Sequence, residues 1–199
     1  MTMRTEEGER FHPGSRAEWR AWLAEHHDRS DAVWLVLWRP RSGREGLTYD
    51  EAVEEALCFG WIDGKAAGLD DERTMLRFSP RKRGSGWARS NKLRVERLLA
   101  EGLMAAPGLA LIEEAKRDGS WTRLDAVEDL VVPDDLAAAL AARPGAREHW
   151  DGFPRSVRRA ALEWIVQAKR PETRARRVGE TARQAAQGER PGPGARPRS

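Results

Sequence analysis

The stretch ALCFGWIDGK, residues 56–65, marks the point where the periodicity of the sequence changes. Before it, Thr48 and Glu51 have the spacing of a capping box, and apolar residues then recur at helical intervals. Gly60 suits the position after a helix C-terminus, because glycine tolerates the left-handed backbone conformation found there. The sequence therefore predicts a helix that ends at Gly60 and a strand that begins at Trp61.

The segments around this junction predict a small sheet. WIDGKAAGL and TMLRFS, separated by DDER, have the alternation and the turn residues of a β-hairpin. DAVWLVLWR, residues 31–39, is apolar on both faces and rich in β-branched and aromatic residues, which indicates a strand covered from both sides. Residues 16–28 follow a capping Ser15 and predict a helix with an aromatic stripe. We expect about three strands.

From residue 86 onward, apolar residues recur at helical spacing. Successive stripes predict several helices, of which the clearest runs from Val157 to Ala168. Pro171 breaks that helix and opens the last one, PETRARRVGETARQAA. The predicted fold class is α+β, with a small antiparallel sheet packed with helices and a mostly helical C-terminal half.

The length and the charge of the chain set its expected organisation. With 199 residues we expect a single domain over 1–187, with an α/β part at about 15–85 and a helical part at about 86–187. The net charge is +3, while residues 170–199 alone hold eight Arg and three Glu. The end of the chain is rich in Arg, Pro and Gly and buries little apolar surface, so 188–199 is predicted to be a disordered basic tail.

Several classes of protein are disfavoured. No run approaches the roughly 18–20 apolar residues that cross a bilayer, so no membrane span is expected. The first residues, MTMRTEEGERFHPG, lack the apolar core of a secretory signal, which predicts a cytoplasmic protein. No metal-ligand spacing, paired-carboxylate motif, nucleophile motif or phosphate-binding loop is present. We therefore expect no metal, no cofactor and no assigned catalytic residue, and we favour a binding protein over an enzyme.

Cys58 is the only cysteine, so no intramolecular disulfide can form. In the predicted helix it lies on the acidic side, beside Glu54 and Glu55. Neighbouring carboxylates disfavour a thiolate, so we expect the pKa of Cys58 to rise. A nucleophile needs the opposite environment, and a small packing residue is therefore the favoured interpretation.

The strand predicted after the junction is a second candidate for function. Trp61, Asp63 and Lys65 alternate and project from one face, either as an ordinary exposed surface or as part of a site. An odd hairpin loop would place Arg77 beside them, and an even one would place Phe78 there. Both registers stay open from the sequence.

SPRKRGSGWARSNK, residues 79–92, is the most basic segment of the predicted folded part. A flexible basic loop that leads into a helix can bind an anion, because free backbone N–H groups and the helix dipole favour negative charge. The segment has no GxxxxGK[ST] motif and is therefore not a Walker loop. A solvated basic turn is the alternative.

Polar residues also extend two of the apolar stripes. Asn91 precedes the stripe of one helix and Arg174 that of another, while Lys169 lies at the end of its own helix. Polar groups on an inward face must find partners or bind a ligand. We combine these residues with the hairpin and the basic turn in one candidate binding surface: Trp61, Asp63, Arg81, Trp87, Asn91, Lys169 and Arg174.

Four blocks in this order are similar to a known bacterial family: LCFGWID, FSPRKRGSGWARSNK, LLAEGLMAAPGLALIEEAKRDGSW and AKRPETRARR. They resemble the YdeI/OmpD-associated family, also called bacteriocin-protection proteins, from about Trp34 to Arg177. The resemblance implies a role in bacteriocin, antimicrobial-peptide or stress resistance, with no settled reaction or cofactor. Family members are described as periplasmic, whereas no export signal is apparent here. The family's motif positions correspond to Gly60, Trp61, Asp63, Pro80, Arg81, Trp87, Asn91, Gly102, Gly119, Trp121, Lys169, Arg170, Thr173 and Arg177.

The sequence thus predicts a cytoplasmic binding protein for an anionic small molecule or partner, in which the aromatic residues supply a packing face and the bases meet the anion. Nucleic-acid binding through the Arg-rich segment 170–199 is one alternative, and it would depend steeply on salt. An enzyme with Asp63 as general acid or base, assisted by Lys65 or Arg81, is the other.

Overall fold

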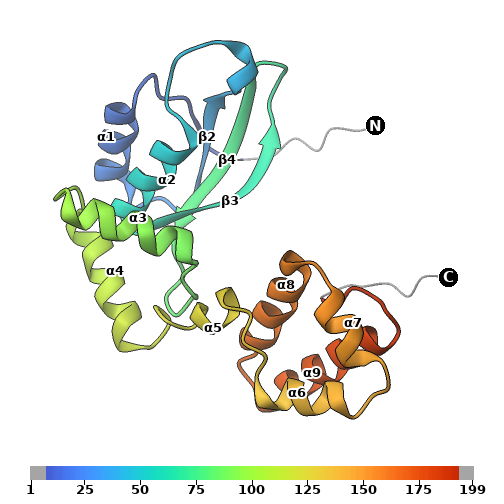
Figure 1. Cartoon of the computed structure of the whole chain (residues 1–199). Helices are drawn as coiled ribbons and strands as arrows, with labels where there is room; N and C mark the ends of the chain where they lie inside the picture. Colours follow the sequence, from blue (N-terminus) through green and yellow to red (C-terminus); the bar gives the residue numbers. More distant parts are fainter. Residues whose placement is uncertain (1–7, 193–199) are drawn as a thin grey trace. The chain divides into compact units, whose positions relative to one another are not determined.

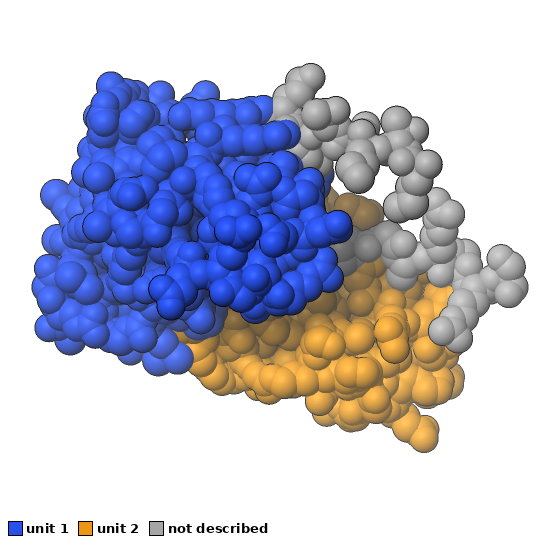
Figure 2. Space-filling model, turned by 90° about the horizontal axis from the view of Figure 1, so that it is seen from above, with its two compact units in different colours: residues 1–85, 90–121 blue, residues 86–89, 122–199 orange. Residues whose placement is uncertain are grey.

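The computed structural model describes residues 8–192 of the chain (Figure 1). They belong to two compact units, coloured separately in Figure 2. Unit 1 contains residues 1–85 and 90–121, and unit 2 contains residues 86–89 and 122–199. Among the described residues, no helix combines the length and the apolar character that a bilayer span requires.

Unit 1 is built on a four-stranded sheet with the strand order β1-β2-β4-β3 (Figure 1). The predicted strands are confirmed as β2 (Val33–Trp38), β3 (Trp61–Gly68) and β4 (Arg73–Pro80), and β4 is antiparallel to both β2 and β3. A fourth strand, β1 (Arg10–Phe11), pairs in parallel with β2. The sequence does not predict β1, because two residues are too few to show a period.

The hairpin of β3 and β4 contains a β-bulge. Asp63 pairs with Phe78, which selects the even-loop alternative at this position, and after a register shift Ala66 pairs with Leu76. The shift reverses the alternation of side chains along the strand. The predicted alternation therefore holds from Trp61 to Asp63 and is interrupted between Asp63 and Ala66.

The remaining elements of unit 1 are one short 3-10 helix and four α-helices: η1 (Pro40–Ser42), α1 (Arg16–His26), α2 (Tyr49–Cys58), α3 (Arg89–Ala100) and α4 (Ala106–Arg117). Figure 1 shows α1 and α2 on the same side of the sheet. Trp19 of α1 packs edge-on against Phe78 of β4, with ring centroids 5.5 Å apart, and its indole N–H donates to the carbonyl of Ala52 in α2. The aromatic stripe predicted for α1 therefore anchors both helices to the sheet.

The local signals at the helix ends are confirmed. The Ser15 hydroxyl accepts a hydrogen bond from the Glu18 N–H, and Thr48 and Glu51 form the reciprocal capping box. Gly60 follows α2 with φ +76°, a backbone conformation that side chains other than glycine rarely adopt. These contacts place the end of α2 and the start of β3 as the sequence predicts.

Unit 2 is helical and has its own core. Its elements are α5 (Asp125–Glu128), α6 (Asp134–Ala141), α7 (Ala146–Gly152), α8 (Arg155–Val166) and α9 (Pro171–Ala186). The core gathers buried side chains from every helix, including Trp150, Leu136 and Ile165. The α+β class with a helical C-terminal half is therefore confirmed.

The end of α9 is held by a Schellman motif. Gly188 has φ +67°, its N–H donates to the carbonyl of Ala185, and the N–H of Glu189 donates to the carbonyl of Gln184. The N–H of Gly192 donates to the side-chain oxygen of Gln184 at 3.2 Å. The first part of the predicted tail is thus hydrogen-bonded, and residues 193–199 lie outside the described residues.

Candidate functional site

The predicted binding surface divides between the two units. Unit 1 holds Trp61, Asp63, Arg81 and Asn91, and unit 2 holds Trp87, Lys169 and Arg174. A single surface that joins both groups stays a prediction.

The two tryptophans of that surface are core residues. Trp61 is 0% exposed and Trp87 is 2% exposed. The indole N–H of Trp61 donates to the carbonyl of His27 at 3.1 Å, and its ring meets the ring of Trp22 edge-on. Burial of these rings stabilises the fold. Neither ring offers an exposed face on which a ligand can stack.

The basic residues of unit 2 differ in their surroundings. The guanidinium of Arg174 forms two hydrogen bonds with the carboxylate of Asp135, at 2.7 and 3.0 Å, and ties α9 to α6. Lys169 is exposed between α8 and α9. Arg174, the polar residue that extends the apolar stripe of α9, therefore has an acidic partner within unit 2.

Asp63 lies beside the first turn of α2. The hydroxyl of Tyr49 donates to Asp63 Oδ2 at 2.9 Å. Burial, together with the bond to this carboxylate, raises the pKa of Tyr49 above its ordinary value of 10.0, so the phenol keeps its proton at neutral pH. Close by, Arg94 pairs with Asp50 at 2.6 Å and donates to Asn91 Oδ1 at 3.3 Å. Asp63 thus accepts a hydrogen bond from Tyr49, and Asn91 accepts one from Arg94, both within unit 1.

Arg81 follows β4 and lines a cleft of about 300 Å³. Its backbone N–H donates to the carbonyl of Gly60 at 2.9 Å, which fixes the start of the basic turn against the end of α2. The described residues that line the cleft include two bases, two hydroxyls and no carboxylate: Ile62, Ser79, Pro80, Arg81, Lys82 and Ser85. This composition favours a negatively charged ligand.

The guanidinium of Arg81 is poorly solvated. Burial lowers the pKa of Arg81 to about 10, and the negative charge of Asp63 acts in the opposite direction. The group is still cationic at neutral pH, but water stabilises its charge less than it would at the surface. An anion bound in the cleft would compensate for the weaker solvation of the Arg81 charge.

The basic turn is closed by its own hydrogen bonds. The N–H and the hydroxyl of Ser85 both donate to the carbonyl of Lys82, at 3.2 and 2.6 Å. The side chain of Arg83 points to a different partner, because its Nε lies 3.3 Å from Glu114. Two arginines of one turn therefore differ: Arg81 lines the cleft, and Arg83 is an exposed residue with an acidic neighbour.

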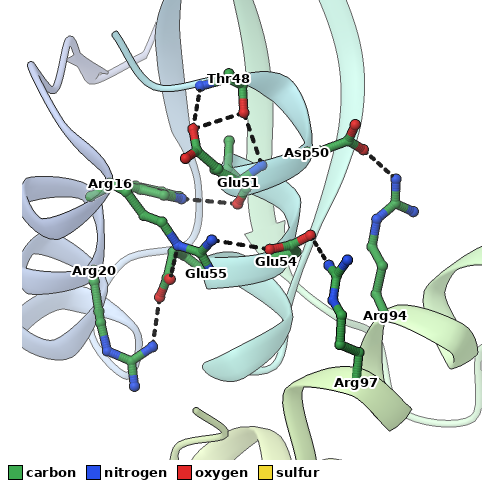
Figure 3. Close-up of polar contacts among 11 residues, drawn as sticks. Arg16, Arg20, Thr48, Asp50, Glu51, Glu54, Glu55, Arg94 and Arg97 are labelled. Carbon is green, nitrogen blue, oxygen red and sulfur yellow. Dashed lines mark hydrogen bonds and ion pairs between the residues drawn. The ribbon is translucent and has the colours of Figure 1, made fainter. Parts of the chain in front are cut away.

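A second polar cluster in unit 1 joins α1, α2 and α3 (Figure 3). Glu55 is only 2% exposed and accepts from Arg16 Nε and Arg20 Nη1, each at 2.6 Å. Glu54 pairs with Arg16 at 3.2 Å and with Arg97. Because these buried carboxylates are bound by guanidinium groups, we interpret the cluster as a structural one. The acidic pair on α2 and the basic pair spaced by four on α1 are the sequence signal for it.

Two family models match separate parts of the chain. Residues 11–111, just over half of the chain, match the model described as Domain of unknown function (DUF8412). The chain belongs to this family. Residues 129–188 match the model described as Bacteriocin-protection, YdeI or OmpD-Associated, which confirms the predicted resemblance for that segment. No curated protein and no solved structure matches the chain.

The DUF8412 segment contains strands β2 to β4, Asp63 and the Arg81 cleft, whereas the bacteriocin-protection segment contains α6 to α9. The late motif positions of the predicted resemblance, from Lys169 to Arg177, lie inside the bacteriocin-protection segment. The earlier ones, including Trp61 and Arg81, lie outside it. The first matched segment thus lies in unit 1 except for residues 86–89, and the second lies within unit 2.

Arginines of α9 in the bacteriocin-protection segment make contacts within unit 2. Arg177 donates to the carbonyl of Trp164 and lies over its ring, with 5.2 Å between the guanidinium carbon and the ring centroid. Arg183 donates to the side chain of Gln187 at 2.7 Å. These contacts occupy part of the basic surface that nucleic-acid binding would use. That alternative stays a prediction.

Cys58 of the DUF8412 segment is fully buried at the end of α2. Burial raises the pKa of the thiol above its ordinary value of 9.0, and the charge of Glu55 raises it further. The predicted direction is confirmed, with burial as the larger cause. The thiolate is therefore scarcer in the folded protein than in the unfolded chain at every pH up to the ordinary pKa.

We expect iodoacetamide at pH 8 to leave Cys58 unmodified in the folded protein and to alkylate it readily in 6 M urea, because only unfolding exposes the thiol and lowers its pKa. Intact-mass spectrometry after timed quenching measures the modified fraction. Alkylation of the folded protein at the rate of the unfolded chain would contradict the packing role of Cys58.

Proposed function

We propose that this protein has a bacteriocin-protection-like role and acts as a binding protein, and that the cleft beside Arg81 holds a small anionic molecule. The charge of the cleft carries the proposal: Arg81 and Lys82 line it, and its described lining residues include no carboxylate. The cytoplasmic location and the bacterial origin predicted from the sequence belong to the same proposal.

The chemistry of the two bases suits a carboxylate, sulfate or phosphate. A guanidinium presents parallel N–H donors that match two oxygens of such an anion, and these charge-assisted bonds strengthen where water is scarce. The exposed side chain of Lys82 adds a second positive charge at the same cleft. Asp63, whose charge acts on Arg81, limits the net positive charge and favours a compact anion over an extended polyanion.

We expect sulfate and phosphate to stabilise the protein against unfolding more than chloride of equal ionic strength does. A ligand at ten times its Kd adds about 1.4 kcal/mol to the free energy of unfolding. Arg81→Ala should remove most of this stabilisation, because the variant lacks the half-buried cation that lines the cleft. Urea denaturation followed by circular dichroism, with and without each anion, measures the difference.

Arg83→Ala is the matched control, because Arg83 belongs to the same turn and pairs with Glu114. It should keep the full response to sulfate and phosphate. Equal responses of the wild type and Arg81→Ala would rule out the cleft as the anion site, and so would equal losses in Arg81→Ala and Arg83→Ala.

A further inference from the structure

A second cavity, of about 410 Å³, is bounded by the end of β2, the segment around η1, the first turn of α2 and β4. We propose that it binds a small molecule with an aromatic or otherwise apolar body and a single anionic group. The proposal does not depend on the Arg81 cleft, whose lining residues are different.

The body of the cavity is apolar. Leu37 of β2 and Leu76 of β4 contribute neighbouring side chains, because the register pairs Leu37 with Thr74, two residues from Leu76. Leu47 and Trp38 add further apolar surface. Burial of an apolar ligand against these side chains supplies the main driving force, at about 25 cal/mol per Å² of surface removed from water. A simple phosphate or sulfate would gain none of it.

The positive charge of the arginines at the cavity favours a ligand with one anionic group. Arg39 and Arg44 both line it. Arg39 Nε donates to the backbone carbonyls of Asp70 and Arg73, at 3.3 and 3.1 Å, and within residues 8–192 no carboxylate pairs with its side chain. Its position is therefore fixed by uncharged groups, and its positive charge is left for a ligand to complement.

Arg44 is placed by an aromatic ring. Its guanidinium carbon lies 4.8 Å from the centroid of the Trp38 ring, and its Nε lies 3.4 Å from Glu72, a half-exposed neighbour. Among the described residues, the two arginines that line the cavity thus have a single carboxylate partner between them, that of Glu72, so the charge at the cavity is positive. A ligand with one negative charge would neutralise this excess positive charge.

Tyr49 completes the cavity from the first turn of α2. Its hydroxyl is engaged with Asp63, so the contribution of Tyr49 to a ligand is the apolar surface of its ring. The side chain is 46% exposed, and its removal should cost the fold little. Tyr49 is therefore a position at which binding can be changed while the protein stays folded.

Two dyes provide matched probes. 1-Anilinonaphthalene-8-sulfonate has an aromatic body and one sulfonate, and N-phenyl-1-naphthylamine has the same rings with no charge. We expect the sulfonate to bind the native protein with a rise in fluorescence, and Arg44→Gln to weaken it about fivefold while changing the neutral dye little. Tyr49→Ala should weaken both dyes, because both use the ring surface.

Arg41→Gln is the matched control, because Arg41 lies in η1, bonds the carbonyl of Asp71 and does not line the cavity. It should bind both dyes as the wild type does, and circular dichroism should confirm that all variants are folded. Excess sulfate should not displace the dye beyond the effect of chloride at equal ionic strength. The proposal is overturned if Tyr49→Ala and Arg44→Gln bind the sulfonate like the wild type, if Arg41→Gln weakens it as much as Arg44→Gln, or if sulfate competes for it.

These readouts separate this cavity from the anion cleft. Loss of the sulfate response in Arg81→Ala tests the cleft alone, and loss of dye binding in Tyr49→Ala tests the cavity alone.

Discussion

Gly108→Ala is expected to destabilise unit 1 by about 3 kcal/mol or more. Gly108 lies in the first turns of α4, where the helix packs against the end of α2. A Cβ at this position would lie 2.3 Å from the carbonyl oxygen of Cys58 and 2.8 Å from that of Leu57. Both are backbone atoms, so neither can turn aside as a flexible side chain would. The gain of about 1 kcal/mol that alanine brings to a helix interior is too small to offset this overlap.

Gly179→Ala is the matched substitution, and it should raise the free energy of unfolding where Gly108→Ala lowers it. Gly179 lies in the interior of α9, and a Cβ there would meet nothing within 4 Å. Alanine should therefore stabilise the helix by about 0.5–1 kcal/mol. Urea denaturation followed by circular dichroism measures both variants, and a Gly108→Ala protein as stable as the wild type would contradict the close approach of α4 to α2.

The double substitution Arg16→Ala, Arg20→Ala should cost about 3–5 kcal/mol of stability. Both guanidinium groups bind Glu55, which is almost completely buried (Figure 3). Their removal leaves the carboxylate in a poorly solvated position, without the two cations that offset its desolvation. Adding Glu55→Leu to the double variant should recover most of the loss, because it removes the buried charge.

Arg29→Ala is the control for this experiment. Arg29 pairs with Glu25 at 2.6 Å, and both side chains are more than half exposed, so its loss should cost less than about 0.5 kcal/mol. The same urea titrations measure the free energy of unfolding of the wild type, the double variant, the variant with Glu55→Leu added, and Arg29→Ala. Equal, small effects of Arg29→Ala and of the double substitution would show that the buried cluster does not stabilise unit 1.

The helix ends were predictable because their signals are local. Ser15, Thr48 and Glu51 act on backbone groups within three residues, and Gly60 acts at its own position. The bulge after Asp63 was not predictable, because it depends on the pairing of two strands rather than on the pattern of either one. Sequence patterns thus located the elements better than their register.

The same distinction applies to the candidate sites. The basic turn with Arg81 is contiguous in the sequence and was predicted as an anion site. The cavity beside Trp38 and Tyr49 was not, because its walls combine residues 37–49 with residues 74–76, which only the sheet brings together. Trp61 shows a different limit of the sequence pattern, because a side chain expected on a binding surface packs in the core.

A titration of the 15N-labelled protein with sulfate, followed through the Nε–Hε resonances of its arginines, tests the anion cleft itself. The resonance of Arg81 should move and saturate, together with the amide resonances of Lys82 and Ser85, while that of Arg83 stays nearly unchanged. Small, unsaturated shifts shared by all arginines would mean that sulfate acts only through ionic strength, and would contradict the proposed site.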